Sequence, residues 1–320
     1  MSVRALVVDP SVSESVRPAD VPDPVAGPDQ VVLEVHHASL NHGDLNDART
    51  GRVPPGAVLG SDAAGVVVQA AADGTGPAVG TRVVALTAGA FAERTTVGVD
   101  GLAPVPESVD LVTAAALPVA GLAALRSLRA AGLTSRKRVL VTGASGGVGR
   151  FAVQLAAHAG AHVIASVGSA GRGEGLAKAG AAEVLIGLAD LDRPVDIVID
   201  NVGGPQLVEA WSMLAPGGSL QSVGWTSGQP ATFPPYSTIG PAKSLTSFVN
   251  EGEFAADLAI LVQLVAEGAL RTEIGWHGSW ENVAEAGKAL RGRQVNGKAV
   301  LDIDTHGRRH AAEDVVVEPR

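Results

Sequence analysis

The chain of 320 residues contains no cysteine, so it forms no disulfide bond and no zinc site built from thiolates. Aromatic residues are rare, at 3% of the chain, and no apolar run approaches the roughly 20 residues of a membrane-spanning helix. The apolar run at the N-terminus is shorter than the hydrophobic segment of a signal peptide. These absences argue against a disulfide-stapled scaffold and a membrane protein, and they predict a cytoplasmic protein.

Basic residues are outnumbered: 24 Lys and Arg stand against 33 Asp and Glu, which gives a formal net charge of −9. The one basic cluster is Arg308-Arg309-His310, near the end of the sequence. Nucleic acid is bound largely through positive surface that neutralises its phosphates. We therefore expect neither nucleic acid nor a membrane as a partner.

Glycine is abundant, with 40 residues, and 46% of the chain is hydrophobic, so the chain can bury a sizeable core in one large or two ordinary domains. Residues 1–112 alternate short apolar runs with Pro and Gly, which predicts a mostly β module. From Val112 onward strand and helix patterns alternate, which predicts a parallel sheet with helices on both faces. In this part we predict strands over 139–141, 162–167, 183–186, 195–200, 219–223 and 298–303, and helices over 151–159, 174–179, 206–214 and 255–270.

A glycine-rich segment follows the first of these strands. The run Val139–Val141 leads through Gly143, Gly146, Gly147 and Gly149 into a helical pattern. Such a turn brings backbone N–H groups and a helix N-terminus to one point, where they favour an anion, and glycine lets that anion come close. The alternative is an ordinary strand–turn–helix whose glycines serve packing. Because strand, glycines and helix occur in the required order, we predict a dinucleotide site.

The next strand, 162–167, indicates which dinucleotide binds. An acidic residue at this position binds the adenosine ribose of NAD, but here the strand runs into Gly168 and Ser169 with Arg172 beyond. A hydroxyl and a guanidinium suit the 2′-phosphate of NADP instead. The alternative is that Arg172 is a solvated surface residue. We predict NADPH as the cofactor.

The segment Thr142–Gly149 also fits the glycine signature of short-chain dehydrogenases. Those enzymes use a Tyr-x-x-x-Lys pair, whereas the only tyrosine here is Tyr236 and the residue four positions later is Gly240. The short-chain alternative is therefore excluded.

The whole pattern resembles the medium-chain dehydrogenase/reductase superfamily, in its zinc-free quinone oxidoreductase branch. The segments that carry this resemblance are Leu40-Asn-His-Gly-Asp44, Leu59-Gly-Ser-Asp-Ala-Ala-Gly65, Val79-Gly-Thr-Arg-Val83, Ala116-Leu-Pro-Val-Ala-Gly-Leu122, residues 144–149, Val202-Gly-Gly204 and Gly297-Lys298. The resemblance implies a GroES-like, mostly β domain interrupted by a doubly wound Rossmann domain, with the nicotinamide in the cleft between them. We expect the β domain over 1–113 and 251–304, the Rossmann domain over 114–250 and a flexible tail over 305–320. A homodimer, joined along the edge at Leu245–Val249, is also implied.

The resemblance also bears on metal binding. Zinc-dependent relatives carry a cysteine in the place of Asn41 and a His-Glu pair in the place of Ser61-Asp62, and neither is present. His36, His37 and His42 suggest another metal site, but adjacent residues of a strand face opposite sides and no third ligand has sensible spacing. We predict that no metal is bound.

Without a metal, no Lewis acid polarises an alcohol, whereas hydride addition to a conjugated, electron-poor acceptor remains feasible. We therefore expect a small-molecule acceptor, a quinone or activated alkene, reduced by NADPH. The alternatives are a non-catalytic, crystallin-like NADPH-binding protein and an imine- or alcohol-type oxidoreductase of a biosynthetic pathway. Tyr236, His42 and water remain open as the proton donor.

The resemblance assigns site residues to the glycine segment, to the ends of the Rossmann strands and to two places in the β domain. The expected catalytic residues are Asn41 and Tyr236, and the expected cofactor-binding residues are Asn41, Ser145, Gly146, Gly147, Val148, Ser169, Arg172, Asn201, Val202, Gly224, Trp225, Thr226, Phe248, Val249 and Lys298. Asn41 has an alternative role as a turn former, and Lys298 an alternative as a solvated lysine. The aromatic residues Trp225, Phe233, Tyr236, Phe248 and Trp276 are expected either to line the acceptor pocket or to pack in the core.

Overall fold

The computed structural model describes residues 2–303, which form two compact units. Of these residues, 2–116, 276–292 and 299–303 make up the first unit, and 117–275 with 293–298 the second. The expected boundary at 113 differs little from this division. Residues 251–275, expected in the β domain, belong instead to the second unit. The expected tail, 305–320, lies outside the described residues.

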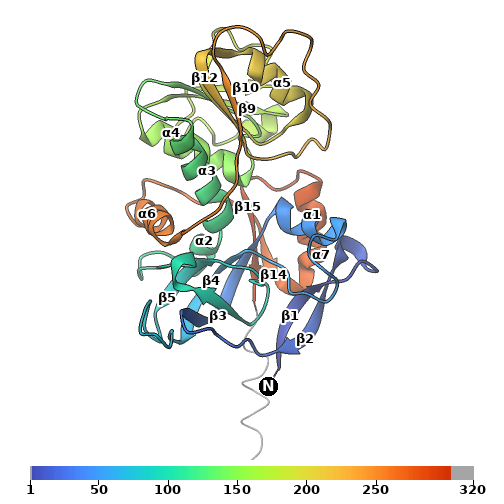
Figure 1. The fold of residues 1–320 in the computed structure, drawn as a ribbon, viewed down its shortest axis with the longest axis vertical. Helices are drawn as coiled ribbons and strands as arrows, with labels where there is room; N and C mark the ends of the chain where they lie inside the picture. The colour runs from blue at the N-terminus through green and yellow to red at the C-terminus, as the bar shows by residue number, and fades with distance from the viewer. Residues whose placement is uncertain (1, 304–320) are drawn as a thin grey trace, which may run out of the picture. The chain divides into compact units, whose positions relative to one another are not determined.

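The first unit is built on antiparallel β structure (Figure 1). Its main sheet has the strand order β14-β15-β3-β4-β5-β7, with β6 paired to β3, and β1 and β2 form a separate hairpin. The strands are β1 Ser2–Val8, β2 Val16–Pro22, β3 Gln30–Leu40, β4 Asp62–Gln69, β5 Arg82–Leu86, β6 Arg94–Gly98, β7 Leu102–Pro104, β14 Ile274–Ser279 and β15 Lys298–Asp302. The helices are α1 His42–Thr50, α2 Leu111–Ala115 and α7 Val283–Arg291. Short Val- and Ala-rich strands suit this sheet because their side chains pack well on a pleated, half-buried surface.

The second unit is a six-stranded, all-parallel sheet in the order β10-β9-β8-β11-β12-β13. Its strands are β8 Arg138–Val141, β9 His162–Val167, β10 Glu183–Ile186, β11 Val195–Asp200, β12 Leu214–Ser222 and β13 Ser244–Ser247. Its helices are α3 Pro118–Ala130, α4 Gly147–His158, α5 Gly204–Ser212 and α6 Ala255–Ala266. Continuous apolar runs form β8, β9 and β11 because these central strands are buried on both faces.

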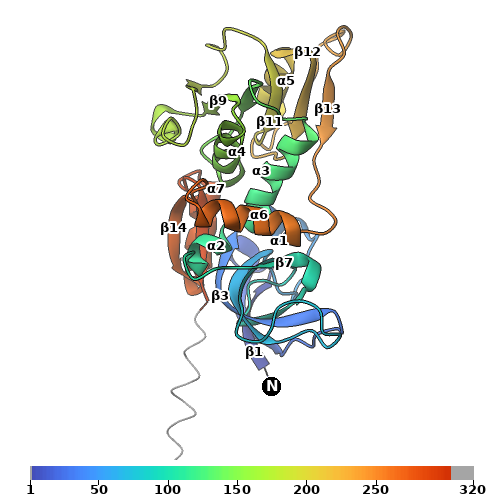
Figure 2. The same ribbon diagram turned by 90° about the vertical axis from the view of Figure 1, so that its left-hand side faces the viewer.

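The strand order reverses direction between β8 and β11. From β8 the chain moves outward to β9 and β10, and from β11 it moves outward the other way to β12 and β13. Right-handed crossovers in opposite directions place α4 on one face of the sheet and α5 on the other, and α3 packs beside α4 (Figures 1 and 2). The loops that follow β8 and β11 therefore lie side by side, at the position where open α/β sheets bind ligands.

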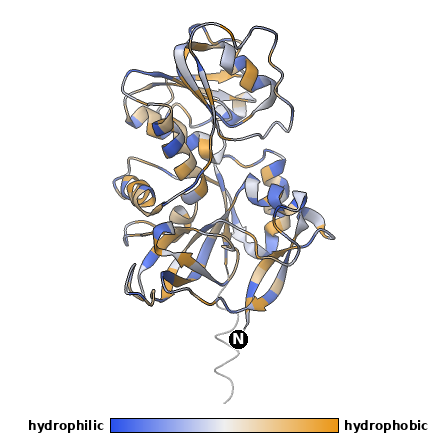
Figure 3. Cartoon of the chain, viewed as in Figure 1, coloured by the Kyte–Doolittle hydropathy of each residue, from blue (hydrophilic) through white to orange (hydrophobic). Residues whose placement is uncertain are grey.

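Two helices depart from the expectation. The helix predicted over 174–179 is absent: the chain forms a 3₁₀ helix, η3 (Ala170–Gly173), and then turns through Gly175 at φ +79° and Gly180 at φ +107°. Glycines in that left-handed conformation end helical propagation. The helix predicted over 255–270 ends at Ala266. This helix, α6, is apolar on nearly all sides (Figure 3), and it packs Leu261 against Gly121 of α3.

Within residues 2–303, no helix is both long enough and apolar enough to cross a membrane.

Candidate functional site

The glycine segment forms the loop from β8 into α4, as its spacing predicts. Gly143 takes φ +59°, and α4 begins after Gly146, which caps the helix without a side chain. A Cβ at Gly149 would lie 2.4 Å from the carbonyl oxygen of Gly143, so only glycine lets the helix pack this close to the strand. The first turn of α4 therefore offers backbone N–H groups and the positive end of its dipole to an anion.

A distant part of the chain runs alongside this loop. Residues 293–298 return to the second unit, where the N–H of Gly297 donates to the carbonyl oxygen of Ser145 at 2.9 Å. Lys298 lies against Gly147, whose Cβ, if present, would come within 2.7 Å of the lysine Cδ. Only 4% of Lys298 is exposed, so it is not the solvated lysine of the alternative interpretation. The structure thus brings Lys298 to the glycine loop.

Arg172 reaches back from η3 to the same loop. Its Nε donates to the Ser145 hydroxyl at 2.9 Å, its Nη2 to the carbonyl oxygen of Val295 at 3.3 Å and its Nη1 to that of Arg293. Burial lowers the pKa of Arg172 below its usual value, and the positive charges of Arg293 and Arg150 lower it further. The positive charges of Arg293 and Arg150 near the Arg172 guanidinium favour a phosphate ligand there. Ser169 is exposed just before η3.

The loop after β11 is anchored by a buried carboxylate that our sequence interpretation did not single out. Asp200 accepts hydrogen bonds from the Thr142 hydroxyl at 2.5 Å and from the N–H of Gly203 at 2.8 Å. Burial raises the pKa of Asp200, and these hydrogen bonds oppose the shift. Asp200 thereby ties the end of β8 to the end of β11. As the last residue of an apolar strand it carried no separate signal in the sequence.

Asn201 follows directly and points its amide into this junction. Its Nδ2 donates to the carbonyl oxygen of Thr142 at 2.8 Å, while its buried Oδ1 has no hydrogen-bond partner among residues 2–303. A buried acceptor without a donor is costly in a folded protein. It fits a site where a ligand supplies the donor. Next to Asn201, Val202 lies against Gly143: a Cβ built on Gly143 would lie 3.2 Å from Cγ2 of Val202.

The segment 224–226 lies beside the β11 loop. Gly224 donates its N–H to the carbonyl oxygen of Asp200 at 3.1 Å, and the Thr226 hydroxyl donates to that of Asn201 at 3.0 Å. The Trp225 ring covers Gly203, where a Cβ would come within 2.5 Å of the ring. The second unit therefore gathers most of the expected cofactor-binding residues around the ends of β8, β11 and β12.

The remaining expected residues of the second unit follow β12 in the chain. The N–H of Phe248 donates to the carbonyl oxygen of Ser222 at 3.0 Å, beyond the end of β13, and Val249 is exposed. Tyr236 is 81% exposed in the loop 223–243, so the fold gives its hydroxyl no packed orientation. Phe233 packs edge-on against Trp211, with ring centroids 6.0 Å apart, and so belongs to the core.

In the first unit, Asn41 occupies the N-cap of α1. It forms a reciprocal capping box with Asp44, whose carboxylate accepts the Asn41 N–H at 2.8 Å. The Asn41 Nδ2 donates to the carboxylate of Asp62 at 3.0 Å, and the Ser61 hydroxyl donates to Asp44 at 2.8 Å. Amide, hydroxyl and two carboxylates thus form one hydrogen-bonded cluster at the end of β3.

Comparison with known proteins follows the same division of the chain. Residues 27–107 match the family model of the alcohol dehydrogenase GroES-like domain, and residues 147–267 match that of the zinc-binding dehydrogenase. Among solved structures, the quinone oxidoreductase from Coxiella burnetii superposes with a TM-score of 0.82 at 25% identity, covering 95% of this chain and 100% of that one. The mycobacterial protein Rv1454c, solved in complex with NADPH, superposes with a TM-score of 0.81 at 25% identity, covering 94% and 100%.

The chain belongs to the medium-chain dehydrogenase/reductase family and is of the quinone oxidoreductase type. Its first unit is the GroES-like domain and its second a Rossmann-like domain, which binds a nicotinamide cofactor in this family. The expected fold class and family are therefore confirmed.

Curated relatives of this chain differ greatly in length. Acryloyl-coenzyme A reductase from Sulfurisphaera tokodaii is 27% identical over 93% of this chain and 99% of its own length. The spectinabilin polyketide synthase system protein NorB from Streptomyces orinoci is 36% identical over 62% of this chain. This chain spans only 10% of the length of that protein.

One of the two matching family models is named for zinc, so the donor set at Asn41 decides whether a catalytic zinc fits. Catalytic zinc is held by three protein ligands drawn from imidazole, thiolate and carboxylate. In this cluster a neutral amide and a hydroxyl stand where the zinc-dependent relatives carry ligands, and the two carboxylates accept hydrogen bonds from them. This donor set does not fit a catalytic zinc.

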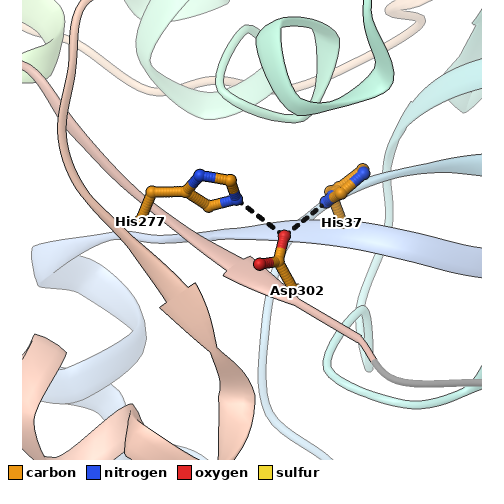
Figure 4. Close-up of side chains that lie close together, drawn as sticks. All are labelled: His37, His277 and Asp302. Atoms are coloured by element: carbon orange, nitrogen blue, oxygen red, sulfur yellow. Dashed lines mark hydrogen bonds and ion pairs between the residues drawn. The ribbon is translucent and has the colours of Figure 1, made fainter.

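His37 has potential metal-ligating neighbours that spacing along the chain did not predict. The sequence offers no third ligand at a sensible spacing, but the structure brings His277 and Asp302 to His37 from two other strands, β14 and β15 (Figure 4). These residues lie 240 or more positions away in the sequence, so spacing could not reveal them. Burial lowers the pKa of His37, although its hydrogen bond to Asp302 raises it.

Proposed function

We propose that the protein is an NADPH-dependent reductase that transfers hydride to a quinone or an activated alkene without a metal at the reacting centre. The observation that carries the proposal is the hydrogen bond from Arg172 to Ser145 of the glycine loop. Arg172 follows β9, and the end of that strand lacks an acidic residue. A 2′-phosphate suits that guanidinium, whereas the ribose of NAD would find no carboxylate there.

Each part of the site has a role in this proposal. The N-terminus of α4 holds the pyrophosphate, and Arg172 with Ser169 holds the 2′-phosphate. Asn201 offers its unpaired Oδ1 to a ribose hydroxyl or to the carboxamide, and the segment 224–226 lies over the ring end of the cofactor. Bound NADPH supplies a hydride from its dihydronicotinamide ring. Asn41 contributes a polar side chain at the reacting end, as the family resemblance implies.

The acceptor class follows from the donor set at Asn41. Because this cluster does not fit a zinc ion, an unactivated alcohol or ketone lacks an electrophile. A quinone, an enone or an enoyl thioester spreads the arriving negative charge over its own conjugated carbonyl, and the protein then only orients it and donates hydrogen bonds. The likeness to an acryloyl-coenzyme A reductase and to a quinone oxidoreductase supports both acceptor types.

The test is steady-state oxidation of NADPH and NADH by the purified chain. The acceptors are a benzoquinone, a naphthoquinone, an open-chain enone, an enoyl-coenzyme A thioester, a cyclic imine and a simple ketone. We expect turnover with a quinone or a conjugated carbonyl, and faster oxidation of NADPH than of NADH. Exhaustive chelation of metal ions should not lower this activity.

Two results would contradict the proposal. Tight NADPH binding without turnover on any acceptor would favour the non-catalytic alternative. Turnover of the simple ketone that chelation abolishes would show metal-assisted alcohol chemistry.

A further inference from the structure

Across the part of the chain that the structure describes, one group of three potential metal ligands comes together: His37, His277 and Asp302 (Figure 4). His37 Nδ1 and His277 Nε2 lie 2.8 Å and 2.7 Å from the same oxygen, Oδ1 of Asp302. The two imidazole rings meet edge to face, with centroids 6.3 Å apart. All three ligand atoms lie within 4.8 Å of one another.

The sheet itself explains why these side chains converge. Strands β14, β15 and β3 are neighbours in that order, so Asp302 stands on the middle strand with one histidine on each side. His37 and Asp302 are direct cross-strand partners in the antiparallel ladder of β3 and β15. Directly opposite residues place their Cβ atoms about 5 Å apart on one face of the sheet. The cluster is therefore set by strand register and not by a loop.

We propose that His37, His277 and Asp302 bind a divalent transition-metal ion, of the zinc, cobalt or nickel class, on the GroES-like domain. Two imidazoles and one carboxylate are a donor set that such ions prefer to the oxygen-only sets of calcium and magnesium. The side chains are 22%, 43% and 42% exposed, which leaves the ion an entry path and room for water as a further ligand.

The geometry needs only a small adjustment to accept the ion. Ligand atoms about 2.1 Å from a tetrahedral ion lie about 3.4 Å from one another. The carboxylate oxygen must therefore retreat about 0.6 Å from each imidazole, and nitrogens now within 4.8 Å of each other must approach by up to about 1.4 Å. Rotation of partly exposed side chains supplies such shifts without moving the strands.

This ion would have a structural effect and no part in hydride transfer. It would tie β14, which is the edge strand of its sheet, to β15 and β3. Any ligand that binds only the folded chain stabilises it, by an amount that grows with ligand concentration over the dissociation constant. The metal site and the proposed reductase activity can therefore be tested independently of each other.

The experiment is a titration of the chelator-stripped full chain with Co²⁺, followed by visible absorption, and with Zn²⁺ in competition with a chromophoric chelator. No nucleotide or acceptor is present, so the result does not depend on the proposed function. We expect one ion per chain and Co²⁺ bands of a nitrogen- and oxygen-ligated, low-coordinate ion. His277→Gln and Asp302→Asn should each weaken binding by at least about 10–100-fold, the cost of losing even an outer-shell partner.

His36→Gln is the matched control, because His36 is the neighbouring residue on β3 and its Nε2 lies 3.3 Å from Glu34 instead of Asp302. This variant should bind Co²⁺ like the unmodified chain. Far-UV circular dichroism and thermal unfolding in chelator verify that each variant is folded. Failure of the unmodified chain to bind either ion, or undiminished binding by His277→Gln, would overturn the proposal.

Discussion

At the scale of single residues, Asn41 combines two interactions that substitutions can separate. Its side-chain oxygen takes part in the cap of α1, and its Nδ2 donates to Asp62. Serine is as good an N-cap as asparagine but has no amide donor of that reach, whereas alanine provides neither. The pair of variants therefore distinguishes a structural role from a role in the reaction.

We expect Asn41→Ala to be less stable than Asn41→Ser by about 1 kcal/mol, the value of an N-cap, as measured by urea unfolding. Both variants should lose the same large fraction of kcat/KM with the best acceptor, because both lack the amide. Full turnover in Asn41→Ser would assign Asn41 to the cap alone.

Arg172 tests the choice of cofactor. A charge-assisted hydrogen bond is worth about 1.5–3 kcal/mol, so Arg172→Ala should raise the Kd of NADPH by about 10–100-fold and leave that of NADH within about 3-fold. Both constants can be measured by fluorescence titration. Arg193→Ala is the control, because Arg193 is an exposed arginine whose Nε lies 3.6 Å from Asp192. Equal losses for the two dinucleotides would contradict the assignment.

The sequence predicts those parts of the candidate site that are local. The glycine loop and Arg172 lie within about one strand–helix unit. Each is recognised from the residue types and their spacing in that short segment. Arg293 and His277 could not be found in this way, because the fold brings them to Arg172 and His37 from segments that are distant in the sequence. Asp200 was missed for another reason: a carboxylate at the end of a buried strand looks like part of the strand.

At the scale of elements, one carboxylate joins α3 to α6. The Arg126 Nε donates to Asp257 at 2.6 Å, and Arg129 forms a second ion pair with it. The Arg126 guanidinium also lies over the Phe254 ring, 4.6 Å from its centroid. This cluster explains why residues 251–275 belong to the Rossmann-like unit, a placement that helix periodicity alone could not decide.

The carboxylate of Asp257 also makes the stability of the folded chain depend on pH. Burial acts to raise the pKa of Asp257, but the hydrogen bonds from Arg126 and Arg129 outweigh it, and the pKa lies below its usual value. A carboxyl with a lowered pKa contributes stability above its unfolded pKa of about 3.9, and loses it as pH falls through the folded value.

Asp257→Asn should therefore be less stable than the unmodified chain by about 1–2 kcal/mol at pH 7, and the difference should shrink below about pH 4. Urea unfolding over a pH series measures it. Glu107→Gln, which removes an almost fully exposed partner of Arg82, should change stability little at any pH. A difference for Asp257→Asn that stays constant down to the lowest pH would refute the assignment.

Element types are predicted where a segment carries its own pattern. The apolar runs at β8, β9 and β11 became buried strands, because both faces of a parallel sheet are covered. The wrongly expected helix over 174–179 had suitable polar and apolar residues, but Gly175 and Gly180 take left-handed conformations there. The periodicity of polar and apolar residues depends on side chains alone, so it does not reveal this constraint on the backbone.

At the scale of the whole molecule, the edges of the parallel sheet bear on assembly. Strands β10 and β13 are its two edges, and Figure 2 shows β13 beside β12. All four residues of β13 are exposed, and the apolar Leu245 and Val249 are among the exposed large side chains. An uncovered edge strand is a template for pairing with another chain. We propose that a second copy of the chain pairs along β13, in the homodimer that the family resemblance implies.

Light scattering should find the unmodified chain as a dimer and Leu245→Lys as a monomer, because a lysine at an edge strand blocks pairing through its charge. Val184→Lys is the matched control: Val184 lies on β10, the opposite edge, and is 39% exposed, against 43% for Leu245. That variant should remain a dimer, so a general effect of added charge would be recognised. NADPH binding by the Leu245→Lys monomer verifies that the Rossmann-like unit is intact. A monomeric unmodified chain, or dissociation by both substitutions alike, would rule out pairing along β13.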